Sequence, residues 1–282
     1  PPPQQQQQQP QQQSSAPGIG ANHTSVEAAA RLAQQQSLQL LGSLAHQTTL
    51  SNGNFSDSQG QSRLVWTYPL ADAERRSYVG SLVGALAPSE AKHWHFKVMT
   101  GMDDLGWEEC STNMGVAGRK TKWLVAPGCS CNYKYSAEPV PPTPFPNWLV
   151  ELMRACMPLC GIANQEDWPN SCNVNSYSDG SEGLDWHADD EALFQGKYKD
   201  CRIISLSLGD TRTFEVALRD NSSAKTMLRL ASGDMCTMEG CFQQHYLHRI
   251  PKESGAKGRV NLTWRWITMH ERSCQMAAVL GQ

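Results

Sequence analysis

A strand with one polar and one apolar face is predicted by Arg259-Val260-Asn261-Leu262-Thr263-Trp264-Arg265, near the C-terminal end of the chain. Side chains alternate between the two faces of a strand, so the polar and basic residues share one face and the apolar and aromatic residues share the other. Two arginines flanking an asparagine suit a small dicarboxylate, because guanidinium groups bind carboxylates through paired, charge-assisted hydrogen bonds. A solvent-exposed edge strand is the alternative that this segment alone leaves open.

The pattern around this strand predicts helices in the first part of the domain and strands in the second. Helical spacing of apolar residues occurs at 72–86 and 147–159, the second after a proline-rich approach. Strands are predicted at 202–208, 212–218, 226–230 and 235–238, with Gly-Asp turns between some of them. The pattern favours a mostly β, α+β fold with a double-stranded β-helix (jelly roll) core.

A metal site is indicated by Trp186-His187-Ala188-Asp189-Asp190-Glu191. Two imidazoles and one carboxylate on one face are a common arrangement for Fe(II) in oxygen-activating enzymes. On a strand, His187 and Asp189 point to the same face, so they supply two of the three ligands. The third ligand is expected to be a distant histidine. His245 and His248 both qualify, but they are three residues apart and face opposite ways on an extended strand, so only one of them reaches the metal.

Four motifs in order resemble the AlkB-type iron(II) and 2-oxoglutarate dependent dioxygenases. They are Asn175-Ser176-Tyr177 with Asp179-Gly180, then His187-Ala188-Asp189-Asp190-Glu191, His248-Arg249-Ile250-Pro251, and the strand 259–265. The segment 205–214 is similar to the family's mid-barrel strand and turn, and Tyr133-Lys134-Tyr135-Ser136 is similar to its substrate-side region. The resemblance covers about residues 120–270, and the motifs are specific jointly rather than singly.

The resemblance implies a set of site residues and a chemistry. It makes His187, Asp189 and His248 the iron ligands, with His248 preferred to His245 because it stands just before an X-X-Pro element. It assigns 2-oxoglutarate to Asn175, Tyr177, Arg259, Asn261 and Arg265. The implied reaction uses dioxygen and 2-oxoglutarate to oxidise a substrate. An oxidised N-methyl group then leaves as formaldehyde, which is the chemistry of DNA or RNA demethylation and DNA repair.

The substrate is less defined by the sequence than the cofactors are. By resemblance, Asp190 and Glu191 approach the exocyclic amine of a bound base, and Tyr135 contacts the substrate. Alternation instead turns Asp190 away from the iron ligands unless the strand ends at Asp189. The alternative for Asp190 is a structural role, in which its carboxylate pairs with a nearby arginine. The alternatives are a protein or small-molecule hydroxylase on the same scaffold, or a noncatalytic cupin-like binding module.

Composition sets the outer bounds on these hypotheses. Residues 1–62 begin with a run of only proline and glutamine and contain almost no charge, so we expect a disordered tail with one transient helix near 24–45, followed by a catalytic domain at 63–282. Within that domain we expect a substrate-side helical region at 63–160 and the jelly-roll core at 161–270. No apolar run of about 18 residues occurs, so no membrane span is expected.

The cysteines and the charges add two expectations. The 10 cysteines lack zinc-type pairing, since the single-residue gap in Cys129-Ser130-Cys131 is short for zinc ligands, and reduced thiols in an intracellular (nuclear or cytoplasmic), monomeric protein are expected. The chain has 24 Lys plus Arg against 27 Asp plus Glu, so any phosphate contact must come from local clusters such as 119–123 and 252–259.

Overall fold

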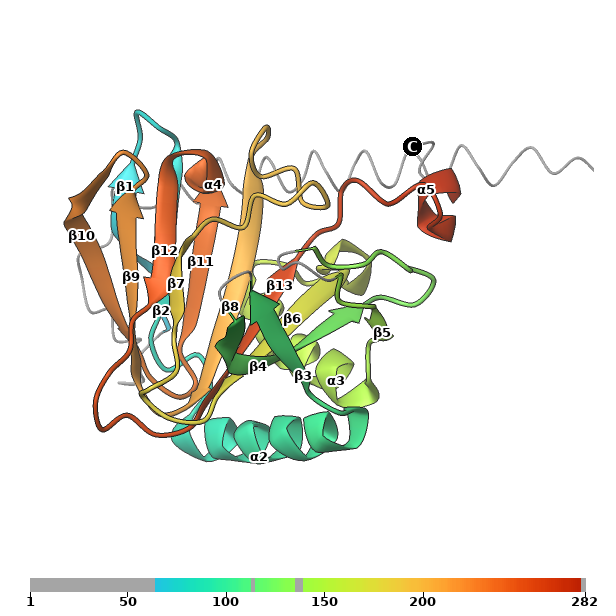
Figure 1. Cartoon of the computed structure of the whole chain (residues 1–282), viewed down its shortest axis with the longest axis horizontal. Helices are drawn as coiled ribbons and strands as arrows, with labels where there is room; N and C mark the ends of the chain where they lie inside the picture. Colours follow the sequence, from blue (N-terminus) through green and yellow to red (C-terminus); the bar gives the residue numbers. More distant parts are fainter. Residues whose placement is uncertain (1–63, 113–114, 135–138, 280–282) are drawn as a thin grey trace, which may run out of the picture.

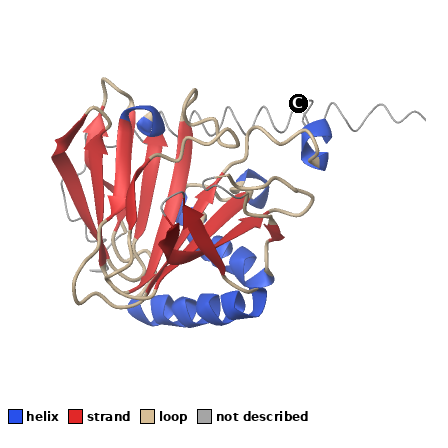
Figure 2. Cartoon of the chain, in the orientation of Figure 1, coloured by secondary structure: helices blue, strands red, loops and turns tan. Residues whose placement is uncertain are grey.

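Two facing β-sheets form the centre of the molecule in the computed structural model (Figures 1 and 2). The structure describes residues 64–112, 115–134 and 139–279. The predicted tail at 1–62, its transient helix at 24–45 and the predicted substrate residue Tyr135 lie outside the described residues. The jelly-roll prediction is confirmed, because strands far apart in sequence pair in antiparallel fashion within both sheets.

The larger sheet has the strand order β1-β2-β11-β8-β13-β6-β4-β3, with β5 pairing in parallel with β4. Its strands are β1 (Thr67–Asp72), β2 (Ser77–Leu82), β3 (Glu108–Thr112), β4 (Gly115–Val125), β5 (Thr143–Pro144), β6 (Ser171–Tyr177), β8 (Cys201–Gly209), β11 (Met235–Gly240) and β13 (Arg259–Arg265). Strand β13 lies between β8 and β6, in register so that Asn261 is opposite both Ser207 and Asn175. The predicted polar strand is therefore central in the sheet, and the edge-strand alternative is wrong.

The smaller sheet has the strand order β10-β9-β12-β7. Its strands are β7 (Leu184–His187), β9 (Arg212–Leu218), β10 (Asn221–Leu230) and β12 (Tyr246–Ile250). Strand β12 pairs with β7 so that His248 lies directly opposite His187. A short helix, α4 (Phe242–His245), leads into β12 and contains His245.

Helices cover the outer face of the larger sheet. They are α2 (Pro88–Leu105) and α3 (Asn147–Cys156), followed by the short helices η1 (Pro158–Cys160) and η2 (Gln165–Asp167), whereas α5 (Gln275–Val279) lies apart from them near the C-terminal end (Figure 1). The apolar face of β13, including Leu262 and Trp264, packs in one buried cluster with side chains of α2 and α3. The helix predicted at 147–159 is confirmed apart from its final turn.

The helix predicted at 72–86 is wrong, because this segment forms the end of β1, a turn and β2. Strand β2 lies between β1 and β11, and almost every one of its residues is buried, so it is a buried run without the alternation of a strand that has one exposed face. Such a run cannot be distinguished from a buried helix by periodicity alone. The helix in this region is instead α2, which the sequence analysis did not predict. The segment 63–160 is therefore a mixture of strands and helices rather than a helical region.

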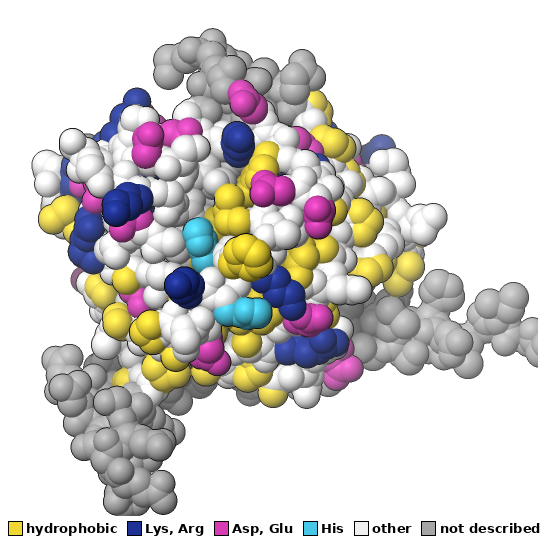
Figure 3. All heavy atoms as spheres, turned by 90° about the horizontal axis from the view of Figure 1, so that it is seen from below, with side chains coloured by type: hydrophobic (Ala, Val, Ile, Leu, Met, Phe, Trp, Pro, Cys, Tyr) yellow, Lys and Arg dark blue, Asp and Glu magenta, His cyan; other side chains and the backbone are white. Residues whose placement is uncertain are grey.

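The outer face over α2 has a mixed character. In the view from below, basic and acidic side chains alternate with apolar ones, and histidines are visible among them (Figure 3). Phe96 of α2 is among the large apolar side chains that are exposed. Among the described helices, none combines the length and hydrophobicity that a transmembrane helix requires.

A close approach at Gly180 joins the loop after β6 to the loop after β12. The Gly180 amide donates to the Ala256 carbonyl, and the Glu253 amide donates to the Gly180 carbonyl, each at 2.8 Å. A Cβ atom on Gly180 would lie 1.7 Å from the Glu253 carbonyl oxygen, which is backbone and cannot rotate away. Only glycine therefore permits this contact without displacement of the loops.

We expect Gly180→Ala to destabilise the protein, because one of the two loops must move. A cost of about 1–3 kcal/mol is usual for overpacking of this kind, which corresponds to a melting temperature lowered by roughly 2–12 °C. Thermal unfolding measures it. Gly258→Ala is the matched control in the facing loop, since its added Cβ meets no atom closer than 3.5 Å. Equal melting temperatures for the two variants would contradict the assignment.

Candidate functional site

Three residues from the smaller sheet and its loop converge in one pocket. His187 ends β7, His248 lies on β12, and Asp189 follows β7 by two residues. The Asp189 Oδ1 atom is 3.7 Å from His187 Nε2 and 4.0 Å from His248 Nε2, and the three potential ligand atoms lie within 4.8 Å of one another. These distances fit one metal ion bound by two imidazoles and a carboxylate. His245 lies on α4 and is not part of this group.

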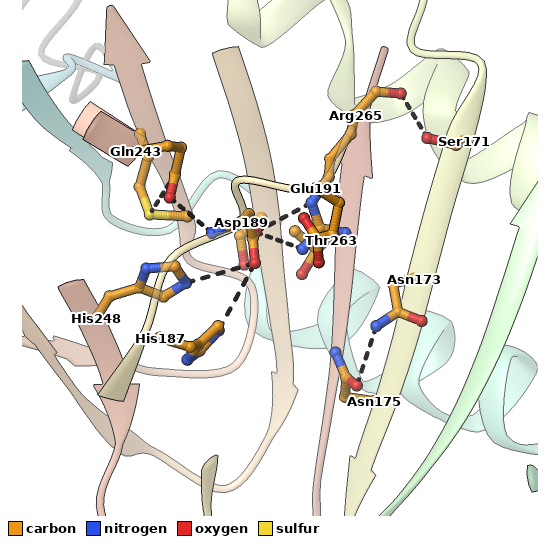
Figure 4. Close-up of polar contacts among 12 residues, drawn as sticks. Ser171, Asn173, Asn175, His187, Asp189, Glu191, Gln243, His248, Thr263 and Arg265 are labelled. Carbon is orange, nitrogen blue, oxygen red and sulfur yellow. Dashed lines mark hydrogen bonds and ion pairs between the residues drawn. The ribbon is translucent and has the colours of Figure 1, made fainter. Parts of the chain in front are cut away.

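Contacts around the group orient its members (Figure 4). Arg265 donates from Nε, at 3.0 Å, and from Nη2 to the Asp189 Oδ2 atom, so Oδ1 faces the histidines. The Asp189 amide donates to Gln243 Oε1 at 2.9 Å. His187 Nδ1 lies 2.8 Å from the Asp185 carbonyl, which favours a proton on Nδ1 and leaves Nε2 unprotonated for a metal.

The two histidines and the aspartate have the protonation states that metal ligands require. Burial lowers the pKa of His187, and burial together with the neighbouring His187 lowers that of His248 well below its usual value, so both imidazoles are neutral. Burial raises the pKa of Asp189, but the charge and hydrogen bond of Arg265 together with the two neighbouring imidazoles offset this effect and hold the pKa of this carboxyl well below its usual range. Metals bind neutral imidazoles and ionised carboxylates, so the group is prepared for an ion.

A second part of the pocket is built by the polar face of β13 and by β6. Arg259 is 3% exposed and donates from Nη2 to Ser207 Oγ at 2.9 Å. Its Nε and Nη1 atoms have no hydrogen-bond partner within the part of the chain that the structure describes. Burial lowers its pKa to about 10. Because a buried guanidinium with unused donors is costly, this position fits the carboxylate of a bound anion.

The remaining residues predicted to contact a dicarboxylate line the same pocket, but their contacts differ. Tyr177 lies beside Arg259, with the guanidinium carbon 5.5 Å from its ring centre. Asn175 Oδ1 accepts from Arg119 Nε at 3.1 Å, and Asn261 Nδ2 donates to Ser205 Oγ at 2.6 Å. Arg265 is occupied mainly with Asp189. Among the two arginines, Arg259 is therefore the one with more donors available to a ligand.

The pocket has a volume of about 320 Å³ and contains both halves of the site. Its lining includes Asp190 and Glu191, the two carboxylates that the resemblance assigns to the substrate. Strand β7 ends at His187, so strict alternation no longer applies to Asp190. The Asp190 carboxylate is paired with Arg219 at 3.2 Å, as the structural interpretation expects, and its contact with a substrate stays a prediction.

Glu191 supplies a further carboxyl to the site. Its Oε1 atom accepts from the Tyr133 hydroxyl at 2.6 Å, and burial together with the charge of Asp189 raises its pKa to about 7. The Tyr133 ring stacks on Trp123 at 4.7 Å between centroids. Trp186 is not in the pocket lining, and the guanidinium carbon of Arg249 lies 4.6 Å from its ring centre.

The sequence analysis missed three residues of this pocket and its support: Tyr133, Arg119 and Gln243. Tyr133 was quoted only within a substrate-side region, whereas the basic cluster 119–123 was considered for phosphate contacts. Arg119 is instead buried against Asn175. Gln243 is fully buried beneath Asp189. In the sequence, only its closeness to His248, five residues later, could have drawn attention to it.

Comparison with known proteins agrees with this geometry. Residues 81–265 match the 2OG-Fe(II) oxygenase superfamily, which is well over half of the chain. The chain belongs to this superfamily. Fe(II) and 2-oxoglutarate are therefore its cofactors, and the group of His187, Asp189 and His248 fits the iron. The chain also resembles a solved structure described as "The structure of OsALKBH1", with a TM-score of 0.50 and 18% identity over 67% of this chain and 96% of that chain, a likeness that concerns the fold.

Curated relatives within the superfamily have AlkB names. The chain is 37% identical over 108 residues to mouse (Mus musculus) "Alpha-ketoglutarate-dependent dioxygenase alkB homolog 3", covering 35% of this chain and 36% of that protein. It is 37% identical over 113 residues to a Caulobacter vibrioides AlkB homolog, covering 37% and 48%. It is 31% identical over 121 residues to "DNA oxidative demethylase ALKBH2" of Arabidopsis thaliana, covering 35% and 38%. The matches thus span a third to a half of these relatives.

Arg259→Ala is expected to weaken 2-oxoglutarate binding about 10- to 100-fold, because hydrogen bonds to a charged group contribute ~1.5–3 kcal/mol. Titration calorimetry without oxygen, with Mn(II) in place of Fe(II), measures this change and the affinity for Mn(II) in parallel. Arg229→Ala is the control, since Arg229 is an exposed arginine paired with Glu253. Equal losses of metal and 2-oxoglutarate binding in Arg259→Ala would show that Arg259 supports the fold instead.

Proposed function

We propose that this chain is an Fe(II) and 2-oxoglutarate dependent dioxygenase that removes alkyl groups from nucleobases in DNA or RNA. The observation that carries this proposal is that Asp190 and Glu191 line the same pocket as the histidine and aspartate group that fits iron. Carboxylates at that position can accept hydrogen bonds from an exocyclic amine and favour a base made cationic by alkylation.

In this proposal His187, Asp189 and His248 bind the iron. Arg265 and Gln243 are positioning residues, because they fix the carboxylate through Oδ2 and through the Asp189 amide. Bound Fe(II) with 2-oxoglutarate supplies the oxidising chemistry, in which the co-substrate is converted to succinate and carbon dioxide. The protein itself orients the reactants and limits the access of water.

Arg259 binds the carboxylate of 2-oxoglutarate that lies away from the metal. Support comes from its unused donors at Nε and Nη1 and from its position on the polar face of β13. Tyr177 borders the same carboxylate position through its contact with the guanidinium. Apolar side chains complete the pocket wall and keep water away from the reacting atoms, namely Leu184, Phe214, Leu230, Met238 and Ile250.

The nucleobase as substrate is supported by two further observations. The curated relatives include a protein named for DNA oxidative demethylation. Asp190 also lies at the exposed side of the pocket, with its side chain 36% exposed and held by Arg219. An extruded base entering there would meet a fixed acceptor. We also propose that the protein is a monomer and that it is located in the nucleus or the cytoplasm.

The catalytic part of the proposal predicts that 2-oxoglutarate is consumed even when no nucleobase substrate is present. The full chain with Fe(II) and ascorbate should convert 2-oxoglutarate to succinate, and His187→Ala should abolish this conversion. His245→Ala is a matched control, because His245 is nearby in sequence but belongs to α4. Succinate measured by mass spectrometry gives the result. If the unmodified chain forms none, or if His187→Ala forms as much as the unmodified chain, the protein is not such an enzyme.

The substrate part predicts demethylation of at least one member of a panel of oligonucleotides, single- and double-stranded, DNA and RNA, each with one methylated base. The reaction appears as a loss of ~14 Da per methyl group removed from the base. Asp190→Asn should lower the rate roughly tenfold or more, since a hydrogen bond to a charged acceptor contributes ~1.5–3 kcal/mol. Its succinate formation without substrate should persist. A panel with no mass change, in a protein that still forms succinate, would exclude nucleobase repair.

A further inference from the structure

A second cluster of metal-ligating side chains lies outside the pocket. Cys129 and Cys131 are in the loop that follows β4, whereas His270 and Cys274 are in the segment between β13 and α5 (Figure 1). Their ligand atoms all lie within 4.8 Å of one another. About 140 residues separate the two halves in sequence, so only the fold brings them together.

The distances within this cluster match a tetrahedral metal site. The His270 Nδ1 atom is 3.7 Å from Cys129 Sγ, 3.4 Å from Cys131 Sγ and 3.5 Å from Cys274 Sγ. With the usual Zn–S and Zn–N bond lengths at a tetrahedral angle, sulfur and nitrogen ligands lie ~3.6 Å apart. One N–H group donates to one acceptor, so three sulfur atoms around the same nitrogen exceed what ordinary hydrogen bonding explains.

Backbone amides point at the sulfur atoms, as expected around thiolates. The Ser130 amide donates to Cys274 Sγ and the Glu271 amide donates to Cys131 Sγ, each at 3.3 Å. Cys131 and Cys274 are at most 2% exposed and His270 is 6% exposed. Hydrogen bonds to coordinating sulfur orient the ligands of a metal and stabilise their negative charge.

We propose that Cys129, Cys131, His270 and Cys274 bind a structural Zn²⁺ ion. Three sulfur ligands and one imidazole are a set that zinc prefers, and four protein ligands leave no open position for catalysis. The gap in Cys129-Ser130-Cys131 is short for zinc ligands, but the fold directs both sulfur atoms toward the same imidazole nitrogen. This proposal differs from the prediction from sequence, in which the cysteines showed no zinc-type pairing.

The zinc would fasten the C-terminal segment to one wall of the pocket. Glu271 accepts from the Asn132 amide at 3.3 Å and pairs with Lys134 at 3.1 Å. Between them, Tyr133 donates to Glu191 inside the pocket. Because the binding energy of a structural metal is folding energy, loss of the ion should loosen this wall as well as lower the stability.

Metal content of the purified full chain tests the proposal. Elemental mass spectrometry should find about one tightly bound zinc per chain. The zinc should persist in the double variant His187→Ala/His248→Ala, which lacks the other metal group, and should be lost in Cys131→Ser/Cys274→Ser. Cys241→Ser is the matched control, because Cys241 is half-buried outside the cluster and a serine keeps its hydrogen bond to Asp200.

Cobalt(II) identifies the ligands. Cobalt bound by three sulfur atoms shows intense thiolate-to-metal charge transfer, which the histidine and aspartate group cannot produce. His270→Cys should retain a tetrahedral cobalt spectrum with stronger charge transfer, whereas His270→Ala should weaken cobalt binding at this site. A native chain that takes up neither zinc nor cobalt here, or charge transfer that is unchanged in Cys131→Ser/Cys274→Ser, would overturn the proposal.

The native chain provides a measurement that needs no substitution. Zinc-bound cysteines react slowly with alkylating reagents, so Cys129, which is partly exposed, should be alkylated much faster after a chelator is added. Peptide mass mapping locates the modification, and the melting temperature should fall with the same treatment. A disulfide between any two of the three cysteines in the chain as purified without a reducing agent, or alkylation that a chelator does not change, would contradict a zinc site.

Discussion

The buried ion pair between Asp189 and Arg265 is the contact on which the site depends. Arg265 ends β13 of the larger sheet, whereas Asp189 follows β7 of the smaller sheet, so this pair joins the two halves of the barrel at the pocket. Neither charge is stable alone in so buried a position, and breaking a buried pair costs ~3–5 kcal/mol. The pair therefore fixes both the spacing of the sheets and the oxygen atom that faces the histidines.

The same constraint separates the roles of the two arginines on β13. Arg265 donates to Asp189 from two nitrogen atoms, Nε and Nη2. Arg259 lies six residues earlier on the same face, and its Nε and Nη1 atoms have no hydrogen-bond partner in the described part of the chain. One arginine is thus committed to the protein and the other is available for an anion. This division follows from the position of each residue along β13, because Arg265 reaches Asp189 after β7 whereas Arg259 contacts Ser207 of β8.

The pocket wall that contains Tyr133 is supported by the C-terminal segment of the chain. Tyr133 stacks on Trp123 and donates to Glu191, while the neighbouring residues Asn132 and Lys134 contact Glu271 of the C-terminal segment. A chain segment that follows the last strand therefore holds a loop that precedes α3. The proposed zinc site lies at this junction, and it would give the wall a rigidity that hydrogen bonds between exposed loops alone do not provide.

The sequence by itself determined the elements whose signals are local. Alternation along 259–265, the His-X-Asp spacing and the Gly-Asp turns predicted strands and the candidate ligands, because side-chain direction in a strand repeats every two residues. The buried strand β2 was mistaken for a helix, since residues covered on both faces lose that repeat. Only the tertiary structure placed His248, which the resemblance had favoured over His245, beside His187 and Asp189. It also placed Gln243 beneath Asp189 and brought Cys129 and Cys131 to His270 and Cys274. Contacts between residues far apart in sequence depend on strand pairing and sheet packing, and no local spacing records them.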